Sequence, residues 1–323
     1  MLDILASTPV QFFLLALCAG MLRSDLAVPE QITKAMSMFL MIAIGMKGGL
    51  ALRQSSIDEV ASVWILFITA ITLSFLLPFV GYTILRFISP LTRLDAAAVS
   101  AHYGSVSVVT FSYAVSYLES RGYSYAGYIV ALMAMMEAPA ILSGILLARE
   151  SKSINPDSRA RLFSGHVIRD AMFNSSIVLL IGAMIIAFNS DSHDLARITP
   201  YIINPFYAVL CLFLLELGLV TSRQCLQLRR FPIGLIIFAI IMPCLSASIA
   251  IGLSVVLNLA FAEAMLFTVL AASASYIAVP AAMKLALPDA NPAYYITASL
   301  AITFPFNLIF GVPMYYQVLK MVL

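Results

Sequence analysis

The chain alternates long apolar stretches with short polar gaps over its whole length. A helix needs about 20 apolar residues to cross the hydrocarbon of a bilayer. By this measure the pattern predicts spans at residues 8–22, 31–52, 62–88, 95–118, 125–148, 166–189, 201–222, 232–262, 264–287 and 292–320. We therefore expect an all-α integral membrane protein with about ten transmembrane helices.

The longest hydrophilic segment, RESKSINPDSRARLFSG, falls between the fifth and sixth predicted spans. It divides the chain into a first five-helix unit at 1–149, a linker at 150–165 and a second five-helix unit at 166–323. Lys and Arg are more numerous on the linker's side of the membrane than on the opposite side. Because basic residues gather in cytoplasmic loops, we expect a cytoplasmic linker and both termini outside.

Five spans before the linker make the second unit enter the membrane with the opposite polarity, as in inverted repeats. The segment AGYIVALMA at 126–134 matches AYYITASLA at 293–301, which lies 167 residues later. The same offset sets Ser105 against Ala272. The sequence thus predicts two inverted five-helix repeats.

Two polar stretches interrupt otherwise apolar spans, AVSAHYGSVSVVTF at 98–111 and AASASYIAVP at 271–280. Irregular backbone at membrane depth is tolerated only where it is buried in protein or lines a cavity. Pro280 removes an amide and kinks or breaks a helix. We therefore expect discontinuous helices near spans four and nine, and corresponding breaks of this kind point to a substrate site.

The chemistry of such breaks suits a small anion with an accompanying cation. Amides at the N-terminus of a half-helix bind anions, and free hydroxyl and carbonyl oxygens coordinate a hard monovalent cation. The predicted substrate-binding residues are Gly104, Ser105, Ser107, Thr110, Ser273, Ser275 and Tyr276. Either stretch alone is equally compatible with close helix packing, in which small residues and serines are common. Their correspondence in the two halves favours a site.

Charged residues inside predicted spans are functional candidates by default. Glu137 is a candidate for the coupling ion, together with the hydroxyls of Ser107, Thr110 and Ser275. Glu216 could serve a cation site or an interface between domains. We expect structural roles for three other residues: Lys47 and Lys284 as anchors at span ends, and His102 as a packed neutral side chain.

The composition narrows the functional class. Of the 323 residues 62% are hydrophobic and 11% are charged, and the mean hydropathy is +1.00. A net charge of +2 gives no reason to expect a nucleic-acid partner. Neither a paired catalytic base nor a metal or nucleotide motif stands out, so we expect no enzyme activity and no cofactor beyond a possible sodium ion.

Three stretches carry a resemblance to a known family. They are VPEQITKAMSMFLMIAIGMKGGLALRQSS at 28–56, the region from HYGSVSVVTF to MEAPA at 102–140, and LAASASYIAVPAAMKLALPDANPAYYITAS at 270–299. Over nearly its whole length the chain resembles the sodium-dependent bicarbonate permease family. The resemblance implies a trimeric inner-membrane symporter of ten helices, with a gate domain and a mobile core domain that each draw helices from both repeats.

The resemblance also implies a bicarbonate site between the fourth and ninth helices, where the hydroxyl-rich breaks at 104–110 and 273–275 face each other. Glu137 matches an acidic residue of the family, and Lys284 matches a basic one. A small PII-like regulator binds cytoplasmically in the cyanobacterial members.

The sequence departs from the family pattern at the first break. Val108 and Val109 remove one hydroxyl there, and Glu137 is one methylene longer than the family's aspartate. Two alternatives therefore stay open. One is a carrier of another small anion, such as a short carboxylate, with weak or no sodium coupling. The other is a non-transporting membrane receptor for an anion.

Overall fold

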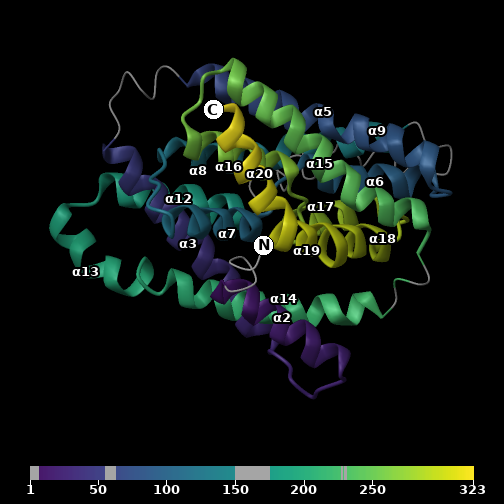
Figure 1. Ribbon diagram of the computed structural model, residues 1–323, viewed down its shortest axis with the longest axis horizontal. Helices are drawn as coiled ribbons and strands as arrows, with labels where there is room; N and C mark the ends of the chain where they lie inside the picture. Colours follow the sequence, from purple (N-terminus) through teal and green to yellow (C-terminus); the bar gives the residue numbers. More distant parts are fainter. Residues whose placement is uncertain (1–6, 55–62, 150–174, 227, 229–230) are drawn as a thin grey trace.

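The computed structural model describes residues 7–54, 63–149, 175–226, 228 and 231–323, and these residues fold into helices without a strand among them (Figure 1). Within this part of the chain, six helical segments are long and apolar enough to cross a membrane. Further apolar helices are shorter, among them Thr8–Met21, Ser175–Asn189 and Phe261–Ala272. The all-α prediction is confirmed for the described residues, whereas the count of ten spans stays a prediction.

The helices of the first unit lie over its five predicted spans. They are α2 (Thr8–Met21), α3 (Glu30–Gln54), α5 (Trp64–Ile88), α6 (Arg93–Gly104), α7 (Val108–Glu119), α8 (Tyr128–Met135) and α9 (Glu137–Arg149). The fourth predicted span is therefore divided into α6 and α7. The fifth is divided as well, which the apolar pattern did not indicate.

The second unit is built in a similar way. Its helices are α12 (Ser175–Asn189), α13 (Ser192–Ile202), α14 (Phe206–Cys225), α15 (Ile233–Val256), α16 (Phe261–Ala272), α17 (Ala278–Ala286), α18 (Pro292–Ile296), α19 (Phe304–Phe306) and α20 (Val312–Val322). Two π-helical stretches, η2 (Thr297–Thr303) and η3 (Asn307–Gly311), join the last three helices. The linker at 150–165 and the start of the sixth predicted span lie outside the described residues.

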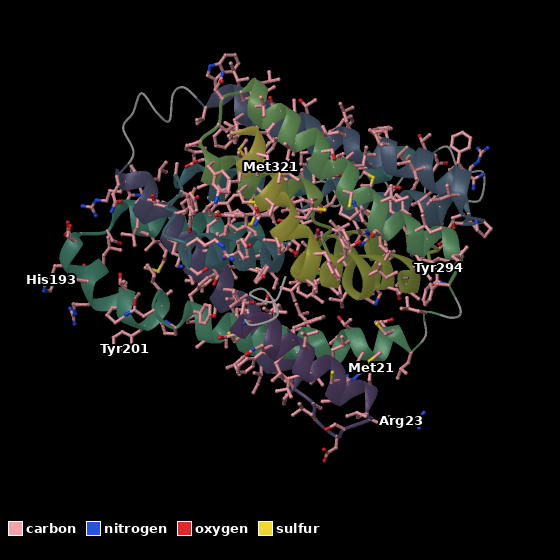
Figure 2. All side chains as sticks on the ribbon, viewed as in Figure 1. Met21, Arg23, His193, Tyr201, Tyr294 and Met321 are labelled. Carbon is pink, nitrogen blue, oxygen red and sulfur yellow. The ribbon has the colours of Figure 1, made fainter. Side chains whose placement is uncertain are left out.

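Two boundaries differ from the prediction. The eighth span was expected to run to residue 262, but α15 ends at Val256 and a turn follows in which Asn258 has a φ of 51°. Helix α13 was not expected, because its sequence is too polar for a span. Figure 2 shows His193 and Tyr201 on the outer side of this amphipathic helix, and Tyr201 is 76% exposed.

The helices pack in two groups. In the first, the paired-helix group, α2 packs along α14 and α3 packs along α12. In the second, the broken-helix group, α5 packs on α6 and α9 while α15 packs on α16. Figure 1 shows α2 and α14 side by side along one edge of the molecule, with α5, α9 and α15 at the opposite edge. Each group thus combines helices from both units.

Helices α6 and α16 correspond residue by residue. Each has 12 residues and carries one carboxylate in its first turn, Asp95 in α6 and Glu263 in α16. Asp95 Oδ1 accepts a hydrogen bond of 2.8 Å from the amide of Asn291, and Glu263 Oε1 accepts one of 2.8 Å from the amide of Ala126. Each carboxylate therefore fastens the start of its helix to a loop of the other unit.

This correspondence corrects the register that was taken from the sequence. Because α6 begins at 93 and α16 at 261, equivalent positions in the breaks are 168 residues apart rather than 167. Ser105 therefore corresponds to Ser273, and Ser107 to Ser275. The segments 126–134 and 293–301 gave the wrong register because the chain between break and segment is one residue shorter in the second unit.

Gly104 is the last residue of α6 and packs closely against α5. A Cβ atom at this position would collide with the ring of Pro78 and the carbonyl oxygen of Ser74. We expect Gly104→Ala to destabilise the fold by about 1–3 kcal/mol, as overpacking does in a dense core. The thermal unfolding midpoint of the protein in detergent micelles measures this effect.

The matched control is Gly182→Ala in α12, where a Cβ atom would have no neighbour within 4 Å. Alanine is the better helix former, so this variant should be neutral or slightly more stable. Equal midpoints for the two variants would show that close packing on α5 does not hold the end of α6.

Candidate functional site at the two helix breaks

The two breaks have nearly the same backbone. Ser105 follows α6 with φ −90° and ψ 171°, and Ser273 follows α16 with φ −86° and ψ 168°. Both serines are therefore extended where a helix would continue. The chain resumes as α7 at Val108 and as α17 at Ala278. The observed interruptions lie where the polar stretches predicted them.

The breaks are hydrogen-bonded to each other. The amide of Ser107 donates to Ser273 Oγ at 2.9 Å, and the amide of Ser275 donates to the carbonyl of His102 at 2.9 Å. Ser273 Oγ passes its own hydrogen bond to the carbonyl of Leu270, also at 2.9 Å. Each break thus donates one amide to the last turn of the other broken helix, directly in one case and through a serine in the other.

Ser107 also caps the helix that follows it. Its Oγ accepts from the amide of Thr110 at 3.2 Å and from the hydroxyl of Thr110 at 3.0 Å. Ser275 lies two residues before Ile277, the N-cap of α17, and the amide of Val279 is 3.4 Å from its Oγ, whereas Ser107 is itself the N-cap of α7. Serine is favoured at this position because its oxygen satisfies a helix amide that has no partner inside the helix.

The role first assigned to Pro280 is wrong. Pro280 is the third residue of α17, in the first turn, where an amide has no helical partner to lose. The break lies before it, at residues 273–277. Pro139 has the same position in α9, and the fifth span is likewise interrupted before it, at Met136. The carbonyl of Met136 accepts a hydrogen bond from the hydroxyl of Ser74.

A small cavity lies between the breaks. Its volume is about 10 Å³, room for about one water molecule or one small ion. It is lined by Val106, Ser107, Val108, Glu137, Ser176, Ser275, Tyr276, Ile277 and Ala278. The first residues of two helices, Val108 of α7 and Ala278 of α17, therefore face one cavity together with a carboxylate.

Comparison of the whole sequence with known families identifies the family of this chain. A family model described as the Na+-dependent bicarbonate transporter superfamily matches residues 8–320. The chain belongs to this superfamily. No curated protein matches it. Membership makes the protein a membrane transporter rather than an enzyme, with sodium and bicarbonate as the chemistry of the superfamily.

The residues expected to bind the substrate or the coupling ion occupy two kinds of position. Ser107, Glu137, Ser275 and Tyr276 line the small cavity. Four others lie behind it: Gly104 packs on α5, Ser105 is buried with its hydroxyl unpartnered, Thr110 bonds to Ser107, and Ser273 holds the amide of Ser107. This second set shapes the cavity without lining it.

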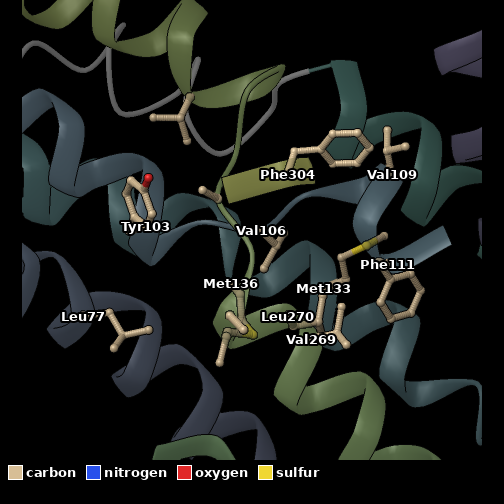
Figure 3. Close-up of a cluster of buried hydrophobic side chains, with 14 of the residues drawn as sticks. Leu77, Tyr103, Val106, Val109, Phe111, Met133, Met136, Val269, Leu270 and Phe304 are labelled. Carbon is tan, nitrogen blue, oxygen red and sulfur yellow. The ribbon is translucent and has the colours of Figure 1, made fainter. Parts of the chain in front are cut away.

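Tyr276 fills part of the space beside the breaks. Its ring packs edge-on against Phe304, with 5.5 Å between the ring centroids. Its phenol oxygen is buried, and the residue shares the cavity lining with Ser107. In Figure 3 the same region of the core contains Val106 together with Met136, Leu270 and Phe304, so apolar packing anchors the first break from behind.

Two polar residues that contribute here were missed from the sequence. Ser176 of α12 lines the cavity from the paired-helix group. Asn307 donates from Nδ2 to the carbonyl of Ala272 at 2.8 Å and so satisfies the last carbonyl of α16. Asn307 could have been found from the sequence, because it is a single asparagine within an apolar predicted span.

The remaining charged candidates have structural partners. Lys47 forms an ion pair with Glu119 at 2.8 Å and lies 4.2 Å above the ring of Phe206, so it is paired rather than merely anchored at a span end. His102 bonds to the carbonyl of Ala98 and stacks on Tyr295, as expected for a packed side chain. Lys284 is exposed in the last turn of α17.

Removal of one hydroxyl tests how the breaks are joined. Ser273→Ala leaves the buried amide of Ser107 without its acceptor, so we expect a loss of about 1–3 kcal/mol in the free energy of unfolding. Ser105→Ala, at the corresponding position, removes a hydroxyl that has no partner and should change this free energy little. Denaturant titration in micelles compares the two, and equal losses would contradict the hydrogen-bonded crossing.

Proposed function

We propose that the protein is a secondary active transporter that moves bicarbonate into the cell with sodium, by alternating access about the two helix breaks. The observation that carries this proposal is the small cavity that two helix N-termini share with a carboxylate and several hydroxyls. Membership of the superfamily supports the same cargo and coupling ion. The steps of the proposal follow from the charges around the cavity.

The anion is attracted by the starts of α7 and α17. A helix N-terminus carries roughly half a positive elementary charge, and its first amides bind anions without a full cation. Val108 and Ala278 bring two such termini to one cavity, and the Ser107 and Ser275 hydroxyls lie beside them. A small oxyanion suits this space because its oxygens can accept from amides and hydroxyls together.

The sodium ion is attracted by oxygen atoms on the same cavity wall. The Glu137 carboxylate lines the cavity with the hydroxyls of Ser107, Ser275 and Ser176, and Thr110 bonds to Ser107. Hard cations prefer carboxylate and hydroxyl oxygens as ligands. A bound sodium ion would offset the repulsion between Glu137 and an entering anion, which is a physical reason for coupling the two.

A cavity of about 10 Å³ is too small for a bicarbonate ion. We infer that transport opens it through movement of the broken-helix group against the paired-helix group. Ser176 comes from the paired-helix group, whereas the break residues belong to the other, so the cavity lies where the two groups meet. These groups take the roles of core domain and gate domain.

The wider assembly forms part of the proposal. The corresponding contacts of Asp95 and Glu263 support two inverted five-helix repeats at 1–149 and 166–323. We place ten transmembrane helices in the inner membrane with both termini outside and the linker at 150–165 in the cytoplasm, by the distribution of basic residues. The resemblance adds a homotrimer and a PII-like regulator on the cytoplasmic side.

A second cargo is supported by the apolar part of the cavity wall. Val106, Val108 and Ile277 face the cavity beside its polar groups. A short carboxylate has an apolar end that could contact such a wall. Because these apolar side chains offer no oxygen ligand to a cation, sodium coupling would be weaker than at a fully polar wall.

Labelled bicarbonate uptake into proteoliposomes tests the main proposal. With sodium outside we expect accumulation, and with potassium in its place we expect a large decrease. Ser107→Leu and Ser275→Leu should each reduce uptake to background, because leucine fills a cavity of this size. The matched control is Ser248→Leu on α15, whose side chain is exposed and bonds only to its own helix.

Undiminished uptake by both leucine variants would contradict the site. Net uptake by liposomes that contain only this protein would exclude a pure receptor.

Competition distinguishes the two cargoes. If bicarbonate is the cargo, we expect a millimolar excess of acetate or pyruvate to leave labelled bicarbonate uptake unchanged. A carboxylate that both blocks bicarbonate uptake and is itself accumulated would favour the second cargo.

A further inference from the structure

A second, larger cavity adjoins the cavity between the breaks. Its volume is about 450 Å³, and Ser176, Tyr276 and Ile277 line both spaces. Its other walls come from α3, α12 and α14 of the paired-helix group and from Leu300 of η2. An ion that reaches the breaks from this side passes through the larger cavity.

The larger cavity contains a carboxylate that the proposed transport mechanism does not use. Glu216 of α14 lines the cavity and is only 7% exposed. Its Oε2 atom is buried without a hydrogen-bond partner. The side chains of Phe213, Leu217 and Val220 surround it on this wall.

No cation among the described residues pairs with Glu216. The ionisable side chains on the elements that pack against it are Cys18 on α2, Glu30, Lys34, Lys47 and Arg53 on α3, Tyr113, Tyr117 and Glu119 on α7, Tyr207, Cys211, Arg223 and Cys225 on α14, and Tyr276 in the second break. Lys34, which also lines the larger cavity, pairs with Glu30 at 2.6 Å, and Lys47 pairs with Glu119. Arg53 bonds to the carbonyl of Ser190. Arg223 is exposed on α14, and its charge acts on Glu216 without forming an ion pair with it among the described residues.

An ionised carboxylate in this setting is costly. Burial of a charge without a counter-ion or donor costs several kcal/mol, and such groups become neutral instead. The apolar wall around the buried Oε2 atom of Glu216 therefore favours the protonated form of this side chain.

We propose that Glu216 is a proton-binding site in the substrate path: it holds a proton on its buried carboxylate and lets the anion pass only in its neutral form. This inference rests on the proposed function, because it assigns a second ligand to the path of the same anion. An ionised Glu216 would repel a bicarbonate ion in a low-dielectric passage, whereas the neutral form would not. High pH should thus inhibit uptake through this residue.

The first test compares uptake by wild type and by Glu216→Gln at a series of pH values. Glutamine is permanently neutral, and both proteins meet the same bicarbonate concentration at each pH, so the ratio of their rates cancels the chemistry of the solution. We expect the ratio of wild type to variant to fall as pH rises, by up to about tenfold per pH unit. Glu216→Asp keeps the carboxylate, so the ratio of its uptake rate to that of Glu216→Gln should also fall as pH rises.

A ratio that stays constant with pH would overturn the proposal, and so would Glu216→Asp behaving like the glutamine variant.

The second test needs no transport. A protonated carboxyl gives an infrared carbonyl band that an ionised one lacks, and wild type in lipid bilayers at neutral pH should show this band. Glu216→Gln should lose it, whereas Glu263→Gln should keep it, because the Glu263 carboxylate is equally buried but accepts a backbone hydrogen bond. A band that persists in Glu216→Gln would overturn the assignment of the proton. If no bicarbonate enters the liposomes at all, the proposed function fails, and the infrared band still decides the state of Glu216.

Discussion

Every buried backbone amide away from water needs a hydrogen-bond partner, and this constraint accounts for the centre of the molecule. Two spans give up their helical hydrogen bonds at the breaks, where neither segment could satisfy its amides alone. The amide of Ser107 finds Ser273 Oγ, and the amide of Ser275 finds the carbonyl of His102. The two irregular segments thus stabilise each other, and the cavity between them exists because they cross.

The two halves satisfy this constraint by similar but unequal means. Ser273 accepts from Ser107 and donates to the carbonyl of Leu270, whereas Ser105 at the corresponding position has no partner for its hydroxyl. Asn307 satisfies the last carbonyl of α16. The second break is thus held by more hydrogen bonds from its own unit than the first, so an approximate symmetry produces two chemically distinct walls.

The sequence could predict the all-α class and both breaks, because apolar length and clustered hydroxyls depend on local sequence alone. It could not predict the register of the halves, since the match at 126–134 lies beyond a loop that differs by one residue. The division of α8 from α9 and the position of Pro280 depend on where each helix begins. The role of Ser176 depends on contact between distant helices, which no local pattern contains.

The contacts between units also set an order for assembly during synthesis. Asp95 finds the amide of Asn291 only after a further 196 residues have followed it. The amide of Ser107 likewise lacks its acceptor until Ser273 has been made. The first unit therefore enters the membrane with polar groups that only later helices can satisfy. Its broken helix can therefore complete these hydrogen bonds only after Ser273 and Asn291 have been synthesised.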